Sequence, residues 1–191
     1  MLRQIRKIIY CLFLAILLCS CSKKSEETIF FLGDSIVARW DVKRFFPAHS
    51  VENLGVSGEG IKYVESMAHS FCNDIVVVII GTNDLKWINS EEQDPYVERY
   101  VKAIYNLDAS TVFLFSILPR SRSTDSENIH QKITSLNKKI QSKVNGTSVV
   151  FIDVYEKFYK NGMNSQYSYD GLHLNEYGYE LLSESLKTYL W

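Results

Sequence analysis

Three side chains in this sequence could together activate a hydroxyl group for attack on a carbonyl carbon. Ser35 lies just after the apolar segment 28–32, and Asp170 and His173 lie far downstream in one glycine-containing segment. A serine hydroxyl is a poor nucleophile until a neighbouring base accepts its proton, and an imidazole base works best when a carboxylate orients it. We therefore predict Ser35 as the nucleophile, His173 as the general base and Asp170 as the residue that orients the base.

Acyl transfer also needs hydrogen-bond donors for the negative charge that develops on the carbonyl oxygen. The backbone amide of Ser35 is one candidate, because it lies where a helix is expected to begin. The backbone amide of Gly58 is a second, since a residue without a side chain lets a substrate oxygen approach closely. The side-chain amide of Asn83 is a neutral third donor. Ser35, Gly58 and Asn83 are thus the predicted oxyanion hole.

Apolar runs alternate with amphipathic stretches along the chain, which predicts a parallel five-stranded sheet between two layers of helices, a three-layer α/β/α sandwich. Between Asp74 and Gly81 the sequence is continuously apolar and β-branched, as a strand covered on both faces must be. The expected strands are 28–32, 51–54, 75–80, 111–118 and 149–154, and the expected helices are 60–71, 95–107, 126–144 and 176–190.

Three loops with chemically useful residues each follow an expected strand directly. They are segments 33–35, 55–58 and 81–84. In a parallel sheet, ligands bind beyond the carboxyl ends of the strands. We therefore expect the three loops to meet at one edge of the sheet.

The N-terminal residues have the pattern of a secretory signal. Basic residues within 3–7 precede the apolar run 8–18, which is too short to cross a bilayer, a span of about 20 residues. Segment 18–21 resembles the bacterial lipobox, which implies that Cys21 is lipidated after cleavage and that more than one acyl chain anchors the protein durably. Ser22 then implies sorting to the outer membrane in a cell with two membranes. Ordinary secretion, with Cys21 merely near the cleavage site, is the alternative.

The expected organisation is therefore a signal peptide at 1–20, a polar tether at 21–28 and one domain at 29–191, exported and lipid-anchored to the bacterial cell envelope. Cys72 is the one cysteine beyond Cys21, which leaves no intramolecular disulfide in the mature chain, and it is expected to be an inert packing residue just before a buried strand. The net charge of −1 and the lack of a basic stripe argue against a nucleic-acid partner.

Four sequence blocks, taken in order, resemble those of the SGNH or GDSL-type hydrolases. They are Gly-Asp-Ser at 33–35, Asn-Leu-Gly-Val-Ser-Gly at 53–58, Gly-Thr-Asn-Asp at 81–84 and Asp-Gly-Leu-His at 170–173. The resemblance implies the flavodoxin-like fold of that family and the same roles for the residues named above. Segment 117–120 looks most like the platelet-activating-factor acetylhydrolase catalytic subunits, which favours a short acyl group such as acetyl.

Other interpretations of the same residues stay open at this point. Ser35 could be a helix N-cap, and Asp170 with His173 could form a surface ion pair or half of a metal site, although no cluster of further ligands accompanies them. Ser57 does not fit the Gly-x-Ser-x-Gly elbow, because Glu59 takes the place of the last glycine. Asp34 is expected to cap locally without a catalytic role. Three histidines without an evident partner are interpreted as surface or packing residues: His49, His69 and His130. Five aromatic residues that precede the Asp170 loop line a pocket or belong to the core, and the core is favoured for most of them: Tyr155, Phe158, Tyr159, Tyr167 and Tyr169.

The sequence thus predicts a serine esterase without cofactor or metal that releases short acyl groups from a carbohydrate or lipid ester. A phospholipase or lysophospholipase that releases longer chains is the nearest alternative. A non-catalytic surface-binding lipoprotein that keeps the fold is another. The alcohol part of the substrate and the oligomeric state do not follow from the residues.

Overall fold

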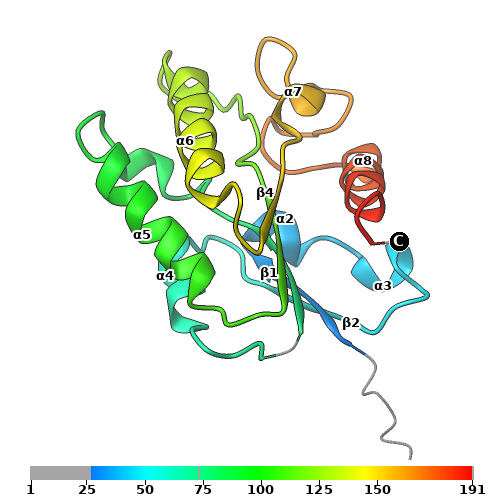
Figure 1. Cartoon of the computed structure of the whole chain (residues 1–191). Helices are drawn as coiled ribbons and strands as arrows, with labels where there is room; N and C mark the ends of the chain where they lie inside the picture. Colours follow the sequence, from blue (N-terminus) through cyan, green and yellow to red (C-terminus); the bar gives the residue numbers. More distant parts are fainter. Residues whose placement is uncertain (1–26, 73, 191) are drawn as a thin grey trace, which may run out of the picture.

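The computed structural model describes residues 27–72 and 74–190 (Figure 1). The predicted signal peptide at 1–20, Cys21 and most of the predicted tether lie outside the described residues. Within the described part of the chain, no helix combines the length and the apolar character that crossing a bilayer requires.

Five parallel strands form the central sheet in the order β2-β1-β3-β4-β5. The strands are β1 (Ile29–Gly33), β2 (Val51–Gly55), β3 (Ile75–Ile79), β4 (Thr111–Phe115) and β5 (Val149–Ile152). The α/β class and the parallel five-stranded sheet predicted from the sequence are confirmed.

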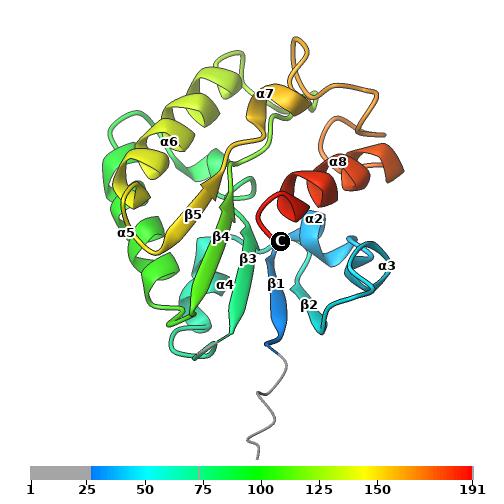
Figure 2. The same ribbon diagram turned by 45° about the vertical axis from the view of Figure 1, so that its right-hand side comes forward.

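Helices cover both faces of this sheet, as Figures 1 and 2 show. The helices are α2 (Ser35–Ala38), α3 (Val42–Phe45), α4 (Ile61–Ser66), the 3-10 helix η1 (Leu85–Trp87), α5 (Gln93–Tyr105), α6 (Ile129–Val144), α7 (Tyr155–Phe158) and α8 (Glu176–Lys187). Helices α4, α5 and α6 pack on one face, and α2, α3 and α8 pack on the other.

Strand β3 illustrates why its sequence is continuously apolar. Val76 and Val78 belong to the core under α4, α5 and α6, whereas Val77 and Ile79 belong to the core under α2, α3 and α8. Successive side chains of a strand point to opposite faces, so both sets must be apolar when both faces are covered. All five residues of β3 are buried.

The register of the sheet brings the three functional loops to one edge. Gly33, the last residue of β1, is paired with Gly55 on one side and with Ile79 on the other. The segments that follow these three residues therefore leave the sheet side by side. This is the arrangement that the positions of the loops after the strands predicted.

The ends of several elements differ from prediction. The helix expected at 60–71 ends at Ser66, because the chain turns and His69 takes a left-handed conformation (φ 58°) that a right-handed helix cannot contain. The strand expected at 111–118 ends at Phe115. There the Asn137 side chain accepts from the amide of Ile117 (2.8 Å) and donates to its carbonyl (2.9 Å), in place of a neighbouring strand.

The prediction that Cys72 is a packing residue is wrong. Its side chain is exposed, and its backbone forms an isolated antiparallel bridge with Ala109 before β3 begins. An apolar strand that starts nearby does not bury a residue that precedes it in a connecting segment.

Candidate active site

Ser35 is positioned by a tight turn between β1 and α2. The carboxylate of Asp34 caps this short helix by accepting a hydrogen bond from the amide of Ile36 (2.9 Å). Gly33 is required at the turn, since a Cβ there would lie 2.1 Å from the carbonyl oxygen of Ile79. Ser35 is the first residue of α2 and is 6 % exposed.

A second tight loop positions Asp170 and His173. One carboxylate oxygen of Asp170 accepts from the backbone amides of Leu172 (3.0 Å) and His173 (2.7 Å). The Ser168 hydroxyl bridges the loop, because it donates to the carbonyl of His173 (2.8 Å) and accepts from the amide of Gly171 (3.0 Å). These hydrogen bonds hold the carboxylate and the imidazole as one unit.

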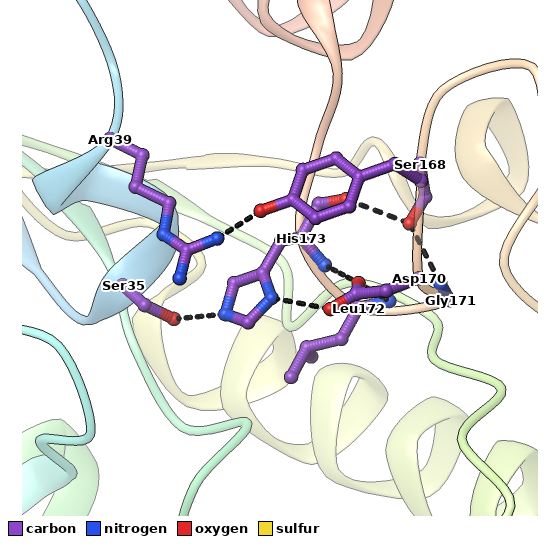
Figure 3. A network of polar contacts seen from close by, with 8 residues as sticks. Ser35, Arg39, Ser168, Asp170, Gly171, Leu172 and His173 are labelled. Atoms are coloured by element: carbon purple, nitrogen blue, oxygen red, sulfur yellow. Dashed lines mark hydrogen bonds and ion pairs between the residues drawn. The ribbon is translucent and has the colours of Figure 1, made fainter.

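The two loops meet through a chain of hydrogen-bonding contacts (Figure 3). Nε2 of His173 lies 3.1 Å from Oγ of Ser35, and Nδ1 of His173 lies 2.7 Å from Oδ2 of Asp170. The imidazole is therefore placed between a hydroxyl and a carboxylate. Such an arrangement lets the ring accept a proton from the serine while the carboxylate holds its other nitrogen.

Hydrogen bonds keep Asp170 ionised. Burial alone would raise the pKa of this carboxyl. The amide and imidazole of His173 and the amide of Leu172 donate to it, however, and together they lower its pKa to about 2. Asp170 is thus a carboxylate at any pH at which the protein would work.

The other two predicted oxyanion-hole residues, Gly58 and Asn83, lie in neighbouring loops. Both line the same cavity, and Nδ2 of Asn83 donates to the carbonyl of Glu59 (2.8 Å), the residue after Gly58. An amide group carries two hydrogens, so one remains to donate to a ligand. Gly58 has a φ of 88°, which favours glycine, and a Cβ at this position would meet no protein atom within 4 Å.

Asp84 fixes the loop that carries Asn83. Its Oδ2 accepts from the amide of Ile61 (2.9 Å) and from the hydroxyl of Tyr96 (2.8 Å). A Cβ at Gly60 would lie 2.1 Å from the other carboxylate oxygen, so the two loops approach closely here. This carboxylate joins the loop after β2 to the loop after β3.

The carboxyl of Asp34 is buried beneath the nucleophile loop. Its Oδ2 has no hydrogen-bond partner within the described residues. Burial, with a smaller contribution from Asp84, raises its pKa to about 7. Asp34 caps α2, as predicted.

The sequence did not predict the contact of Tyr169 with His173, and it did not indicate Arg39 at all. Tyr169, 61 % exposed, stacks on the His173 ring with the ring centroids 6.0 Å apart, and Arg39 of the α2–α3 connection donates to its hydroxyl. Of the two interpretations that the sequence left open for Tyr169, pocket lining or core, its exposure excludes the core. No periodicity could reveal a contact between two loops that lie 130 residues apart in sequence.

The histidines that were set aside lie elsewhere. Nδ1 of His130 is 3.0 Å from the hydroxyl of Tyr155, and His69 lies near the carboxylate of Asp108 (3.9 Å). Ser57 is exposed in the loop before Gly58. Over residues 27–72 and 74–190, no three His, Cys, Asp or Glu side chains are grouped as metal ligands.

The chain belongs to the GDSL-like lipase/acylhydrolase family, which it matches over residues 31–181. A curated relative is the N-acylneuraminate cytidylyltransferase of Escherichia coli O18:K1:H7, with 28 % identity over 171 residues. The alignment covers 85 % of this chain but only 40 % of that protein.

Solved structures share the fold over nearly the whole chain. A GDSL-like lipase from Bacteroides thetaiotaomicron is 22 % identical, with a TM-score of 0.73 and coverage of 91 % and 92 % of the two chains. A structure from Streptococcus pneumonia, provisionally described as a platelet activating factor, is 25 % identical (TM-score 0.71, 90 % and 87 %). A catalytic mutant of an acetylxylan esterase from Geobacillus stearothermophilus is 14 % identical (TM-score 0.66, 85 % and 93 %).

Proposed function

We propose that this protein is a serine esterase in which Ser35, His173 and Asp170 form the catalytic triad. One observation carries the proposal: the imidazole of His173 lies 3.1 Å from the Ser35 hydroxyl and 2.7 Å from the Asp170 carboxylate. Membership of an acylhydrolase family supports the same reaction class.

The proposed reaction has two halves. Oγ of Ser35 attacks the ester carbonyl while Nε2 of His173 takes its proton, and the imidazolium then gives that proton to the departing alcohol oxygen. Water, activated by the same imidazole, attacks the acyl-enzyme and releases the acid. Asp170 stabilises the imidazolium in both halves, and the amides of Ser35, Gly58 and Asn83 stabilise the oxyanion.

The acyl groups that the protein is proposed to release are short ones, such as acetyl. The cavity that opens beside Gly58 and Asn83 has a volume of about 850 Å³, and its lining is rich in charged side chains. This cavity therefore does not suit a long acyl chain, because its charged groups would lose water against the chain. This argues for the short-chain esterase over the phospholipase. The fold shared with an acetylxylan esterase is compatible with that choice.

A carbohydrate is the proposed alcohol part of the ester. The Escherichia coli relative is named for an N-acylneuraminate, which is a sugar, and this supports a sugar ester over a lipid ester. Nucleotidyl transfer is not proposed for this chain, since the aligned region is a minor part of that relative.

Nitrophenyl esters of increasing chain length test the acyl preference directly. We expect fast turnover of the acetyl ester and a steep fall beyond butyryl; faster turnover of octanoyl or longer esters would instead favour the phospholipase. Covalent labelling by a fluorophosphonate, located by mass spectrometry, should fall on Ser35 and not on the exposed Ser57. An unlabelled protein without esterase activity would favour the non-catalytic surface-binding lipoprotein.

We also propose export of the protein and lipid anchoring through Cys21, on the lipobox-like sequence at 18–21. Metabolic labelling with a fatty-acid probe in a bacterial host should mark the wild-type chain but not Cys21→Ser. Equal labelling of the two chains would contradict the anchor.

A further inference from the structure

The cavity beside the proposed oxyanion hole carries an excess of positive charge. Its cationic lining residues are Lys62, Lys86, Arg120, Arg122 and Lys132, against the two carboxylates of Asp84 and Asp125. The chain as a whole has a net charge of −1, so this local excess has the opposite sign to the protein. A concave surface of one sign concentrates ligands of the other.

Both carboxylates in the lining are already engaged by the protein. Asp125 forms an ion pair with Nη2 of Arg120 (2.7 Å), and both side chains are largely buried. The Asp84 carboxylate accepts from Ile61 and Tyr96, as described above. The charge of Asp125 is thus matched by Arg120, whereas Asp84 keeps its negative charge because both of its donors are neutral. With five cationic side chains and two carboxylates, the lining has a formal excess of three positive charges.

Two cationic side chains of the cavity lining are available to bind a ligand. Lys62 and Arg122 are exposed, and within the described residues their side chains form no hydrogen bond or ion pair. Lys132, by contrast, donates to the carbonyl of Leu85 (3.0 Å). An exposed ammonium and a guanidinium beside one cavity can bind a carboxylate or a phosphate without first breaking a protein contact.

The same cavity has an exposed aromatic wall. Trp87 of η1 is 71 % exposed, and Nζ of Lys86 lies 4.6 Å from its ring centroid. A tryptophan left this exposed presents a flat apolar face with a polar edge, which suits the C–H face of a sugar ring. Thr124 and Ser126, which line the cavity as well, offer hydroxyl groups to the hydroxyls of a sugar.

We propose that this cavity binds the sugar part of the ester, and that the sugar carries an anionic group, a carboxylate or a phosphate. Lys62 and Arg122 bind the anion, and Trp87 stacks on the ring. The inference rests on the proposed esterase function and narrows its substrate to acylated acidic sugars. A volume of about 850 Å³ is within the range of about 300–1,000 Å³ found for small-ligand sites.

Binding to the Ser35→Ala variant of the chain tests this without requiring turnover. Three acetylated methyl glucosides serve as probes, identical except at C6, which carries a hydroxymethyl group, a carboxylate or a phosphate. We expect at least one anionic probe to bind about tenfold more tightly than the neutral one in NMR titrations, and this preference to shrink in 0.5 M salt. Whichever anionic probe binds more tightly identifies the group.

The double variant Lys62→Glu/Arg122→Glu, made in the same Ser35→Ala background, should abolish the preference. Lys138→Glu/Lys102→Glu, the same charge change at exposed lysines that do not line the cavity, should keep it. Equal affinity for all three probes would overturn the inference. Hydrolysis of nitrophenyl acetate by the wild-type protein is measured separately, so loss of the charge preference and loss of esterase activity are distinguished.

Discussion

The hydroxyl of Tyr179 in α8 donates a buried hydrogen bond to the carbonyl oxygen of Ile36 in α2, 2.9 Å away. Trp40 adds a second connection, because its ring stacks on Tyr179 (centroids 6.2 Å apart) and its Nε1 donates to Ser183 (3.0 Å). The helix that follows the His173 loop is thus attached directly to the helix that begins with Ser35. The distance between the Ser35 hydroxyl and the His173 imidazole depends on this attachment.

Replacing Tyr179 by Phe should lower the free energy of unfolding by about 1–3 kcal/mol, because the buried carbonyl of Ile36 loses its donor. Urea unfolding measures this loss. Tyr105→Phe is the matched control, since the Tyr105 hydroxyl donates to the carbonyl of Lys143 (3.1 Å) at an exposed position and should matter less. An equal loss in both variants would contradict the role given to burial.

Ser35→Ala and His173→Ala should each lower kcat for nitrophenyl acetate on the order of 10⁴-fold or more, since each removes one half of the proton transfer. Circular dichroism should show both variants folded. His49→Ala, a histidine outside the site, should retain full activity. Substantial activity in either site variant would exclude the proposed triad.

Asn83→Ala should lower kcat on the order of 10²–10³-fold with a smaller change in KM, because an oxyanion donor acts mainly in the transition state. Steady-state kinetics with nitrophenyl acetate separates the two constants. Asn145→Ala, a change at an exposed asparagine, is the control. A reduction confined to KM would assign Asn83 to substrate binding instead.

Asp170→Asn should lower kcat on the order of 10³–10⁴-fold, because a neutral amide neither stabilises the imidazolium nor fixes the same ring tautomer. The carboxylate has a pKa of about 2 in the folded protein, so the wild-type protein should show no loss of activity from its protonation above pH 4. The thermal unfolding temperature of the variant is measured alongside. An unchanged temperature assigns the loss of activity to catalysis, and a lowered one assigns it to disruption of the loop that carries Asp170 and His173.

Asp34 should make the fold less stable as the pH rises. Its pKa is raised from 3.8 to about 7 in the folded state, so between these values the folded protein holds a proton that the unfolded chain has released. By linkage, the free energy of unfolding then falls with rising pH, on the order of 2–4 kcal/mol from pH 4 to pH 8.

Asp34→Asn keeps an oxygen to accept from the Ile36 amide but cannot ionise. Its stability, followed by urea unfolding at pH 4, 6 and 8, should therefore fall less than that of the wild-type protein. Parallel pH profiles for the two proteins would contradict a buried, titrating carboxyl at this position.

The sheet could be predicted because the spacing of apolar residues and the alternation of strands and helices can be read from short stretches of the sequence. The approach of the loops at 33–35, 55–58 and 81–84 followed from the rule that the carboxyl ends of parallel strands share an edge. The catalytic roles of Ser35 and His173 remain predictions, although the structure places their side chains within hydrogen-bonding distance.

The missed features depend on contacts between distant segments. The side chain of Asn137 ends strand β4, because it hydrogen-bonds to both the amide and the carbonyl of Ile117. Nothing in the sequence near either residue indicates that pairing. Tyr169 lies on the His173 ring because of where two loops meet, and a single aromatic residue in a loop carries no periodic signal. Contacts between distant segments, rather than the local sequence, determine the surroundings of these residues.

The contact between Ser35 and His173 joins residues 138 positions apart, one near each end of the described chain. If Ser35 and His173 act as proposed, the nucleophile leaves the ribosome long before the base, and α8 must pack on the sheet before the two can meet. A polypeptide that stops before His173 would then lack the proposed base, so ester hydrolysis would report that the chain had been made and folded past that residue.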